Sequence, residues 1–280
     1  MVWRCLVGSI IDLDGLEEKN ATGAGEKEEK EVVYYKAPDI PTIDVYANPE
    51  PKEHTLLYAH LANDTYMSNS DYQNGAKTED RKYYTERGVV RLYDICIPDH
   101  GFCFKTDEFG DNKNYNMALY QYGSEFILGI AGTADLTDLG TALIQPLGVS
   151  KQYSLFNDVV RDIKKVYPNL TIVAHSMGGA IAANAAMANG VKAVTFNADA
   201  VALTTKVNSG GTSAKSYLVH NYVMNDFVRG LNFVKALFMI NKFEKDGQYH
   251  YITAPSSGFH PIENHFMINM INALQKAGYK

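Results

Sequence analysis

The chain has 280 residues, 46% of them hydrophobic and 21% charged, a composition that can bury a sizeable core in one α/β domain with an extension. Its formal net charge of −6 and the lack of a basic block argue against nucleic acid and against an anionic membrane surface as electrostatic partners. The three cysteines include no Cys-x-x-Cys pair, so we expect neither a disulfide framework nor a zinc site, and a single Cys96–Cys103 bridge is the alternative. We expect no metal and no cofactor.

The first residues of the sequence bear on the cellular location of the protein. Residues 1–11 contain a short apolar run but no small-residue cleavage site before the acidic residues begin, so no signal peptide is predicted. No apolar run reaches the length of a transmembrane helix. The location therefore stays open: we expect the cytoplasm by default, or export by a route that needs no signal peptide.

Residues 1–52 are predicted to form an N-terminal extension before a main domain over 53–280. Glu and Lys dominate the segment from about 17 to 31, which is typical of a mobile, solvated loop. Four prolines then block any long helix, namely Pro38, Pro41, Pro49 and Pro51. We assign residues 32–52 no function, and an interaction module built on the extension is an alternative role for residues 1–52.

The first half of the main domain alternates between helical periodicity and short apolar runs. In chain order, we expect a helix over 53–68, a polar loop over 69–86, strands over 89–97 and 101–105, and two strands that flank Gly123-Ser124 as a hairpin and end at Gly132-Thr133.

The second half alternates more regularly between strands and helices. In chain order, we expect a helix over 154–167, a strand over 170–173, a helix capped by Asn189-Gly190, strands over 191–197, 216–224 and 249–253, and a last helix over 261–276. This alternation predicts an α/β fold with an open, mostly parallel sheet and helices on both faces.

One serine lies where the strand over 170–173 passes into the next helix. Ser176 stands in the motif Ala174-His-Ser-Met-Gly178. A tight turn from strand to helix leaves little room for neighbouring side chains, and it lifts the serine hydroxyl above the sheet. The sequence therefore predicts a nucleophile elbow, with Ala174 in place of the first glycine of the regular Gly-x-Ser-x-Gly form. The alternative is a glycine-rich turn that only packs a helix on the sheet.

A serine nucleophile needs a base within hydrogen-bond reach and an acid that orients the base. In α/β-hydrolase chains the order is serine, acid, histidine. Two aspartates follow predicted strand ends: Asp226 comes after the strand over 216–224, and Asp199 after the strand over 191–197. Because the later of these loops usually carries the acid, Asp226 is favoured. Asp199 is the alternative, and helix capping is its other role.

Three histidines that follow this acid are candidates for the base. His260 is favoured, because it precedes Pro261, a residue preferred at the first helical position, and so lies at the turn that enters the last helix. His265 is the alternative, although a helical projection of 261–276 puts it on the polar face, as a surface residue. His250 lies inside a predicted strand, where a packed or exposed side chain is expected.

Backbone N–H groups are the expected donors to the oxyanion. One is the amide of Met177, directly after the nucleophile, and the other comes from the loop that follows an earlier central strand. Gly132-Thr133-Ala134 supplies that loop, so we assign the second donor to Thr133. An ordinary turn residue is the alternative role of Thr133.

Four motifs in sequence order carry a family resemblance. They are Gly132-Thr133-Ala-Asp-Leu-Thr-Asp138-Leu, Ala174-His-Ser-Met-Gly178, Val194-Thr-Phe-Asn197 and Asn225-Asp-Phe-Val228. With them the chain resembles the class 3 lipases, including bacterial lipase-like relatives, over roughly residues 54–275. The resemblance implies an α/β-hydrolase fold, hydrolysis of lipid acyl esters, a triad of Ser176, Asp226 and a C-terminal histidine, and an oxyanion hole at Thr133 and Met177.

The chain departs from the family pattern at three places. They are Ala174 in the elbow, Ile130-Ala131 where many members carry an aromatic residue and an arginine, and the ending His260-Pro-Ile-Glu-Asn264, which is similar to the bacterial His-x-x-x-Asn form. These departures concern the substrate and the choice of histidine.

The predicted function is a serine ester hydrolase that cleaves lipid acyl esters through an acyl-enzyme, as a triacylglycerol lipase or a phospholipase A. The alternatives are a short-chain carboxylesterase, a thioesterase or an acyltransferase on the same triad, or a catalytically silent binding module. The expected partners are a lipid or other acyl-ester substrate and, transiently, a membrane surface. Apolar segments over 140–150 and 229–243 are candidates for a lid, and a buried helix is the other role of the second.

Overall fold

The computed structural model describes residues 52–93, 95–97, 102–103, 116–132, 151–199, 218–224, 226, 248–253 and 262–279. The chain divides into two units, 1–36 and 37–280, and every described residue belongs to the second. The predicted extension over 1–52 lies outside the described residues except for its last position, so its division from the main domain stays a prediction.

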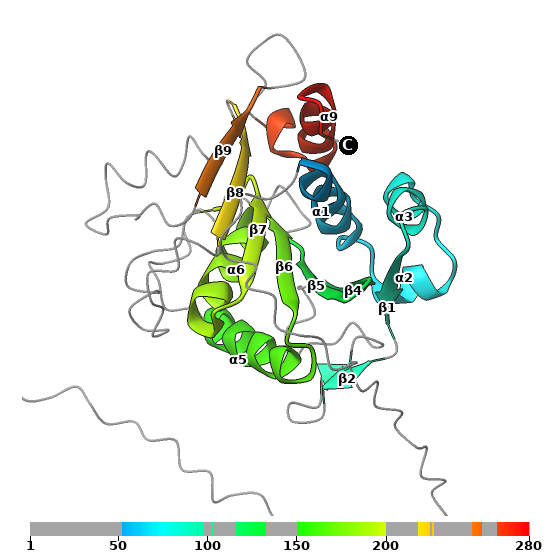
Figure 1. The fold of residues 1–280 in the computed structure, drawn as a ribbon, viewed down its shortest axis with the longest axis vertical. Coiled ribbons are helices and arrows are strands. Elements are labelled where there is room, and N and C mark those ends of the chain that lie inside the picture. Colours follow the sequence, from blue (N-terminus) through cyan, green and yellow to red (C-terminus); the bar gives the residue numbers. More distant parts are fainter. Residues whose placement is uncertain are drawn as a thin grey trace, which may run out of the picture. The chain divides into compact units, whose positions relative to one another are not determined.

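A seven-stranded mixed sheet forms the centre of the described fold (Figure 1). In their order across the sheet, the strands are β1 (Val89–Leu92), β4 (Met117–Tyr122), β5 (Glu125–Ile130), β6 (Leu170–His175), β7 (Lys192–Phe196), β8 (Leu218–Val223) and β9 (Gln248–Ile252). The first two pairings are antiparallel, and the strands from β5 to β9 are parallel. Every residue of β6 is buried, as expected of a central parallel strand covered on both faces.

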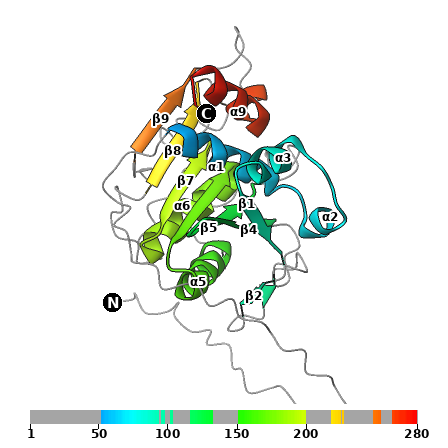
Figure 2. The same cartoon turned by 45° about the vertical axis from the view of Figure 1, so that its right-hand side comes forward.

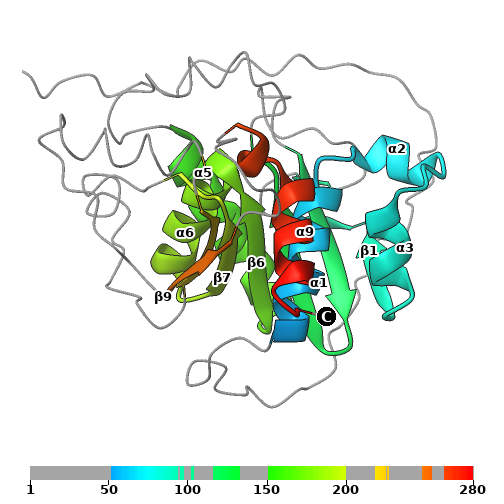
Figure 3. The ribbon, with the colours of Figure 1, turned by 90° about the horizontal axis from the view of Figure 1, so that it is seen from above.

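Helices cover both faces of this sheet. One face carries α5 (Lys151–Val166) and α6 (Ser176–Asn189), and the opposite face carries α1 (Lys52–Asp64) and α9 (Met267–Lys276), which pack side by side (Figure 3). Beyond α1 lie the shorter helices α2 (Asn69–Gln73) and α3 (Glu79–Thr85), near the edge strand β1 (Figure 2). The 3₁₀ helix η3 (Glu263–His265) precedes α9.

Neighbouring residues of β6 show why the core has two layers. Ile172 belongs to the apolar cluster that contains Phe156 of α5, whereas Val173 belongs to the cluster that contains Leu61 of α1 and Met270 of α9. Successive side chains of a strand point to opposite faces, so an apolar run buries both. The predicted α/β architecture, a mostly parallel sheet with helices on both faces, is confirmed.

Most of the predicted elements are confirmed. The hairpin at Gly123-Ser124 joins β4 to β5, and α5, β7, β8 and β9 lie where helical spacing and apolar runs predict them. Gly190 ends α6 in the left-handed conformation, with φ of 59°, as the predicted cap requires.

Two predictions in the first half of the domain were wrong in detail. The segment 69–86, predicted to be a loop, contains α2 and α3, because the Ser68 and Thr78 side chains accept hydrogen bonds from backbone N–H groups of their first turns. The strand predicted over 89–97 is two strands: β1 pairs with β4, and β2 (Cys96–Ile97) pairs with β3 (Phe102–Cys103).

Candidate active site

Ser176 is the first residue of α6 and follows the last residue of β6 directly. Its φ of 55° lies in the left-handed region, which is strained for a residue with a side chain. Close packing explains the small neighbours: a Cβ on Gly178 would lie 2.5 Å from the Ala131 carbonyl oxygen, whereas Ala174 fits fully buried in the core. This is the geometry of the predicted nucleophile elbow.

The imidazole of His265 contacts both the serine and an aspartate. Its Nε2 lies 2.9 Å from Ser176 Oγ, and its Nδ1 lies 2.9 Å from Asp226 Oδ2. The three residues are only 3% to 4% exposed. A carboxylate can only accept, so Nδ1 carries the proton that it donates to Asp226, and Nε2 accepts from the serine hydroxyl.

The prediction that His265 is a surface residue was wrong. The helical projection assumed one helix over 261–276, but Phe266 is extended, with ψ of 141°, and separates η3 from α9. This break turns the His265 side chain into the interior. His260, the favoured candidate, lies outside the described residues, and His250 lies partly buried in β9, as predicted.

The two aspartates occupy different places beside the serine. Asp226 follows β8, and its carboxylate contacts His265. Asp199 follows β7, is partly buried, and donates its backbone N–H to the Ser176 carbonyl oxygen at 3.1 Å. The favoured acid is therefore the one whose carboxylate reaches the imidazole.

Of the two predicted oxyanion donors, Met177 is described and Thr133 is not. Met177 follows the serine directly, in the first turn of α6. Gly132 lies against the serine: a Cβ there would be 2.8 Å from Ser176 Cβ. The chain that leads to Thr133 thus passes directly beside Ser176. The two candidate lid segments also lie outside the described residues.

Sequence reasoning missed three polar residues around the serine. Tyr66 Oη lies 2.6 Å from His175 Nδ1 and accepts the Gly132 backbone N–H at 3.0 Å. His175 Nε2 lies 2.7 Å from the His265 carbonyl oxygen. No local sequence pattern predicts these contacts, since Tyr66 and His175 stand 109 positions apart.

The third residue is Asn197, which has a positive φ of 45° directly after β7. Its amide donates to the carbonyl oxygens of Asn264 and His265, and its side-chain oxygen accepts the backbone N–H of Val223. An asparagine at a strand end tolerates the left-handed region, which was the available sequence signal.

Burial shifts the pKa values of two of these groups. It lowers the pKa of the His175 imidazole well below its ordinary value of 6.5, and the nearby His265 adds to this shift. Burial also raises the pKa of the Tyr66 hydroxyl. Both groups are therefore neutral near pH 7, as hydrogen bonding between them requires.

Within the described residues, no three His, Cys, Asp or Glu side chains are placed to hold a metal ion together. The described helices also include none long and apolar enough to cross a membrane.

Residues 57–228, more than half of the chain, match the Tle-like phospholipase domain family. The chain belongs to this family. The matched region contains Tyr66, Gly132, Ser176 and Asp226 and ends before His265. Family membership confirms the lipase-like resemblance drawn from the motifs.

The individual relatives cover different shares of the chain. An extracellular phospholipase A1 of Serratia liquefaciens is 33% identical over 117 residues, which are 41% of this chain and 36% of the relative. The chain thus matches little more than a third of the relative's length. Two solved structures are also similar: a nonglycosylated LIP2 lipase of Yarrowia lipolytica (16% identity, 76% of this chain, 82% of that chain, TM-score 0.43) and M37 lipase (12% identity, 82% of each chain, TM-score 0.41).

Proposed function

We propose that this chain is a phospholipase of the A type, which hydrolyses an acyl ester of a glycerophospholipid through an acyl-enzyme on Ser176. The observation that carries the proposal is the hydrogen-bonded series from the Ser176 hydroxyl through His265 to Asp226, with both contacts at 2.9 Å. The phospholipase-like family and the name of the Serratia relative support the choice of substrate.

In the acylation step, His265 Nε2 takes the proton of Ser176 Oγ as this oxygen attacks the ester carbonyl carbon. The Met177 N–H and, by our proposal, the Thr133 N–H stabilise the tetrahedral oxyanion. Asp226 holds the imidazole in the required tautomer and stabilises its protonated form. The imidazolium then protonates the leaving glycerol oxygen, and a lysophospholipid departs.

In the second step, water replaces the lysophospholipid. His265 Nε2 takes a proton from the water, whose oxygen attacks the acyl-serine carbonyl. Collapse of the tetrahedral intermediate returns the proton to Ser176 and releases the fatty acid. The reaction thus uses one water for each ester and needs no cofactor.

Exposed apolar side chains border these residues. Met224 precedes Asp226 by two positions, and Ile262 and Phe266 flank the turn that carries His265. We infer that they contact a lipid surface transiently during turnover. Ile262→Ser should then slow hydrolysis of phospholipid vesicles more than that of a soluble short-chain ester, and equal effects on both would contradict the contact.

The test of the proposed function is covalent labelling with a fluorophosphonate probe. The wild type should be labelled, Ser176→Ala should not, and Ser154→Ala, which changes an exposed serine of α5, should be labelled like the wild type. A folded wild type that resists the probe would contradict a serine hydrolase and favour a silent binding module.

Product analysis then tests the substrate. Phosphatidylcholine vesicles should yield fatty acid and lysophosphatidylcholine in equal amounts by mass spectrometry. Labelling without these products, but with turnover of short-chain or thioester substrates, would favour an esterase or a thioesterase on the same residues.

A further inference from the structure

A series of hydrogen bonds outside the triad joins two parts of the site. It runs from the Gly132 backbone N–H to Tyr66 Oη (3.0 Å), on to His175 Nδ1 (2.6 Å), and from His175 Nε2 to the His265 carbonyl oxygen (2.7 Å). Gly132 leads to the loop in which we place the second oxyanion donor. His265 is the proposed base.

The direction of each bond follows from the chemistry of the groups. A carbonyl oxygen only accepts, so His175 Nε2 carries a proton and donates it to His265. The neutral imidazole then has an acceptor at Nδ1, so the Tyr66 hydroxyl donates to it. The Tyr66 oxygen in turn accepts the Gly132 N–H, so the hydroxyl is both a donor and an acceptor.

The His265 carbonyl is held from two sides. It accepts the Nε2 proton of His175 and, at 3.2 Å, the side-chain amide of Asn197. Because both donors stand at the ends of central strands, the backbone of the proposed base is tied to the sheet. His175 keeps its own orientation through the bond from Tyr66.

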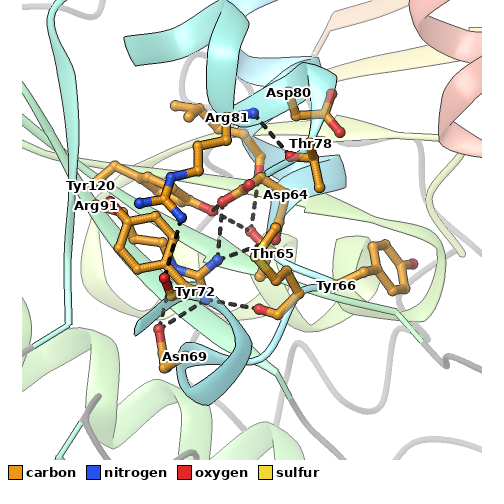
Figure 4. A network of polar contacts seen from close by, with 12 residues as sticks. Asp64, Thr65, Tyr66, Asn69, Tyr72, Thr78, Asp80, Arg81, Arg91 and Tyr120 are labelled. Carbon is orange, nitrogen blue, oxygen red and sulfur yellow. Dashed lines mark hydrogen bonds and ion pairs between the residues drawn. The ribbon is translucent and has the colours of Figure 1, made fainter. Parts of the chain in front are cut away.

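Tyr66 itself is fixed by a second cluster, which we name the arginine cluster (Asp64, Asn69, Arg91 and Tyr120). Arg91 is buried and donates to the carboxylate of Asp64, to the side chain of Asn69 and to the carbonyl oxygens of Asp64 and Met67. These bonds hold the backbone on both sides of Tyr66. Figure 4 shows the Tyr66 ring directed away from this cluster.

The backbone of Tyr66 itself is bonded on both sides: its N–H donates to the Asn63 carbonyl oxygen at 3.1 Å, and its carbonyl oxygen accepts from Asn116, which precedes β4. The Asn116 side-chain amide donates to the Tyr66 carbonyl oxygen at 3.0 Å. With its main chain held in this way, the phenol can reach Gly132 and His175 without a further ordering cost in each catalytic cycle.

We propose that Tyr66 is a positioning residue of the active site, whose hydroxyl holds the strand end before Thr133 and, through His175, the backbone of His265 in register with Ser176. This inference rests on the proposed function. Tyr66 touches no reacting atom in it. It sets the distance between the group that takes the serine proton and the loop that stabilises the oxyanion.

The test compares Tyr66→Phe with Tyr58→Phe. Tyr58 is a buried tyrosine of α1 whose hydroxyl bonds to the Glu125 carboxylate at the start of β5, so its variant loses a similar hydrogen bond away from Ser176. With p-nitrophenyl butyrate, Tyr66→Phe should lower kcat about 10- to 100-fold and leave KM within about threefold, because the defect is one of alignment. Tyr58→Phe should leave both constants unchanged.

A second pair of variants tests the hydrogen bond from His175 to the His265 carbonyl. This test does not depend on whether Tyr66→Phe folds. His175→Gln keeps an amide donor near the former Nε2, whereas His175→Asn is too short to reach the His265 carbonyl. His175→Gln should therefore retain more kcat than His175→Asn, and Tyr66→Phe should cost less in the His175→Asn background than in the wild type.

Three results would overturn the inference. It fails alone if the wild type is labelled by fluorophosphonate but Tyr66→Phe matches Tyr58→Phe in kcat, or if His175→Gln and His175→Asn are equally active. It fails together with the proposed function if the folded wild type is not labelled. The labelling of the wild type thus separates the two failures.

Discussion

Two buried clusters in the described fold each contain an aspartate, and they differ in what their chemistry permits. In the arginine cluster, Asp64 is paired at 3.0 Å with Arg91, and both side chains are fully buried. Burial raises the pKa of Asp64, and the Arg91 guanidinium opposes that shift. In the serine cluster (Ser176, His265 and Asp226), the partner of the aspartate is an imidazole that can take and return a proton.

The backbone marks the same difference. Ser176 is held at a positive φ, and this strained residue presents its hydroxyl to His265. No residue of the arginine cluster has a positive φ. A buried, paired carboxylate is therefore a poor sign of catalysis by itself. The informative combination is a strained nucleophile next to a group that can transfer a proton.

The largest effect that we expect is a loss of kcat when the histidine of the serine cluster is replaced, compared with a histidine outside that cluster. His265→Ala should lower kcat by about 10⁴- to 10⁶-fold, because the serine loses its base. His260→Ala should change kcat by no more than a few-fold. Steady-state kinetics on p-nitrophenyl butyrate, with circular dichroism as a check of folding, would measure both. The reverse order of effects would return the role of base to His260.

A smaller effect is expected at the arginine cluster, where a substitution should lower the stability of the fold. Arg91→Met leaves the Asp64 charge buried without its partner and should lower the free energy of unfolding by about 3–5 kcal/mol. Chemical denaturation would measure it. The double variant Asp64→Asn/Arg91→Met should recover part of this loss. A loss below about 1 kcal/mol in Arg91→Met would mean that Asp64 is not left as an uncompensated buried charge.

The smallest effect that we expect is a decline of folding stability at acidic pH, which His175 causes. His175 has a pKa below 6.5 in the folded protein, so below pH 6.5 the unfolded chain binds a proton that the folded chain does not. Stability therefore falls as pH falls, by up to about 1.4 kcal/mol per pH unit for this group.

The measurement is the melting temperature between pH 7.5 and 5.0. His175→Gln should show a shallower decline than the wild type, since the titrating imidazole is gone while Tyr66 and His265 remain. Parallel curves for the two proteins would contradict a buried, neutral His175.

The sequence predicted those features that depend on local patterns. Apolar runs located the strands of the sheet from β4 to β9, and small residues around Ser176 located the elbow, because steric limits there act on near neighbours. The order of serine and acid then indicated Asp226.

Other features depend on contacts between distant residues and left no local pattern. His265 has the same helical spacing as a surface residue, and only the extended backbone at Phe266 turns it inward. The partners of Tyr66 lie 66 and 109 positions further along the chain. The two short helices were missed because their caps, Ser68 and Thr78, stand in a segment without apolar periodicity.

The packing of α1 against α9 also sets an order of events during synthesis. The chain emerges from its N-terminal end, so Tyr66 and Ser176 leave the ribosome well before His265 does. Met270 and Leu274 of α9 pack in the same apolar cluster as Leu57 and Leu61 of α1, so the helix that closely follows His265 is held against α1. A nascent chain that ends before residue 263 therefore carries Ser176 at a positive φ without the proposed base. Esterase activity should therefore arise only after residues 263–276 have packed against α1.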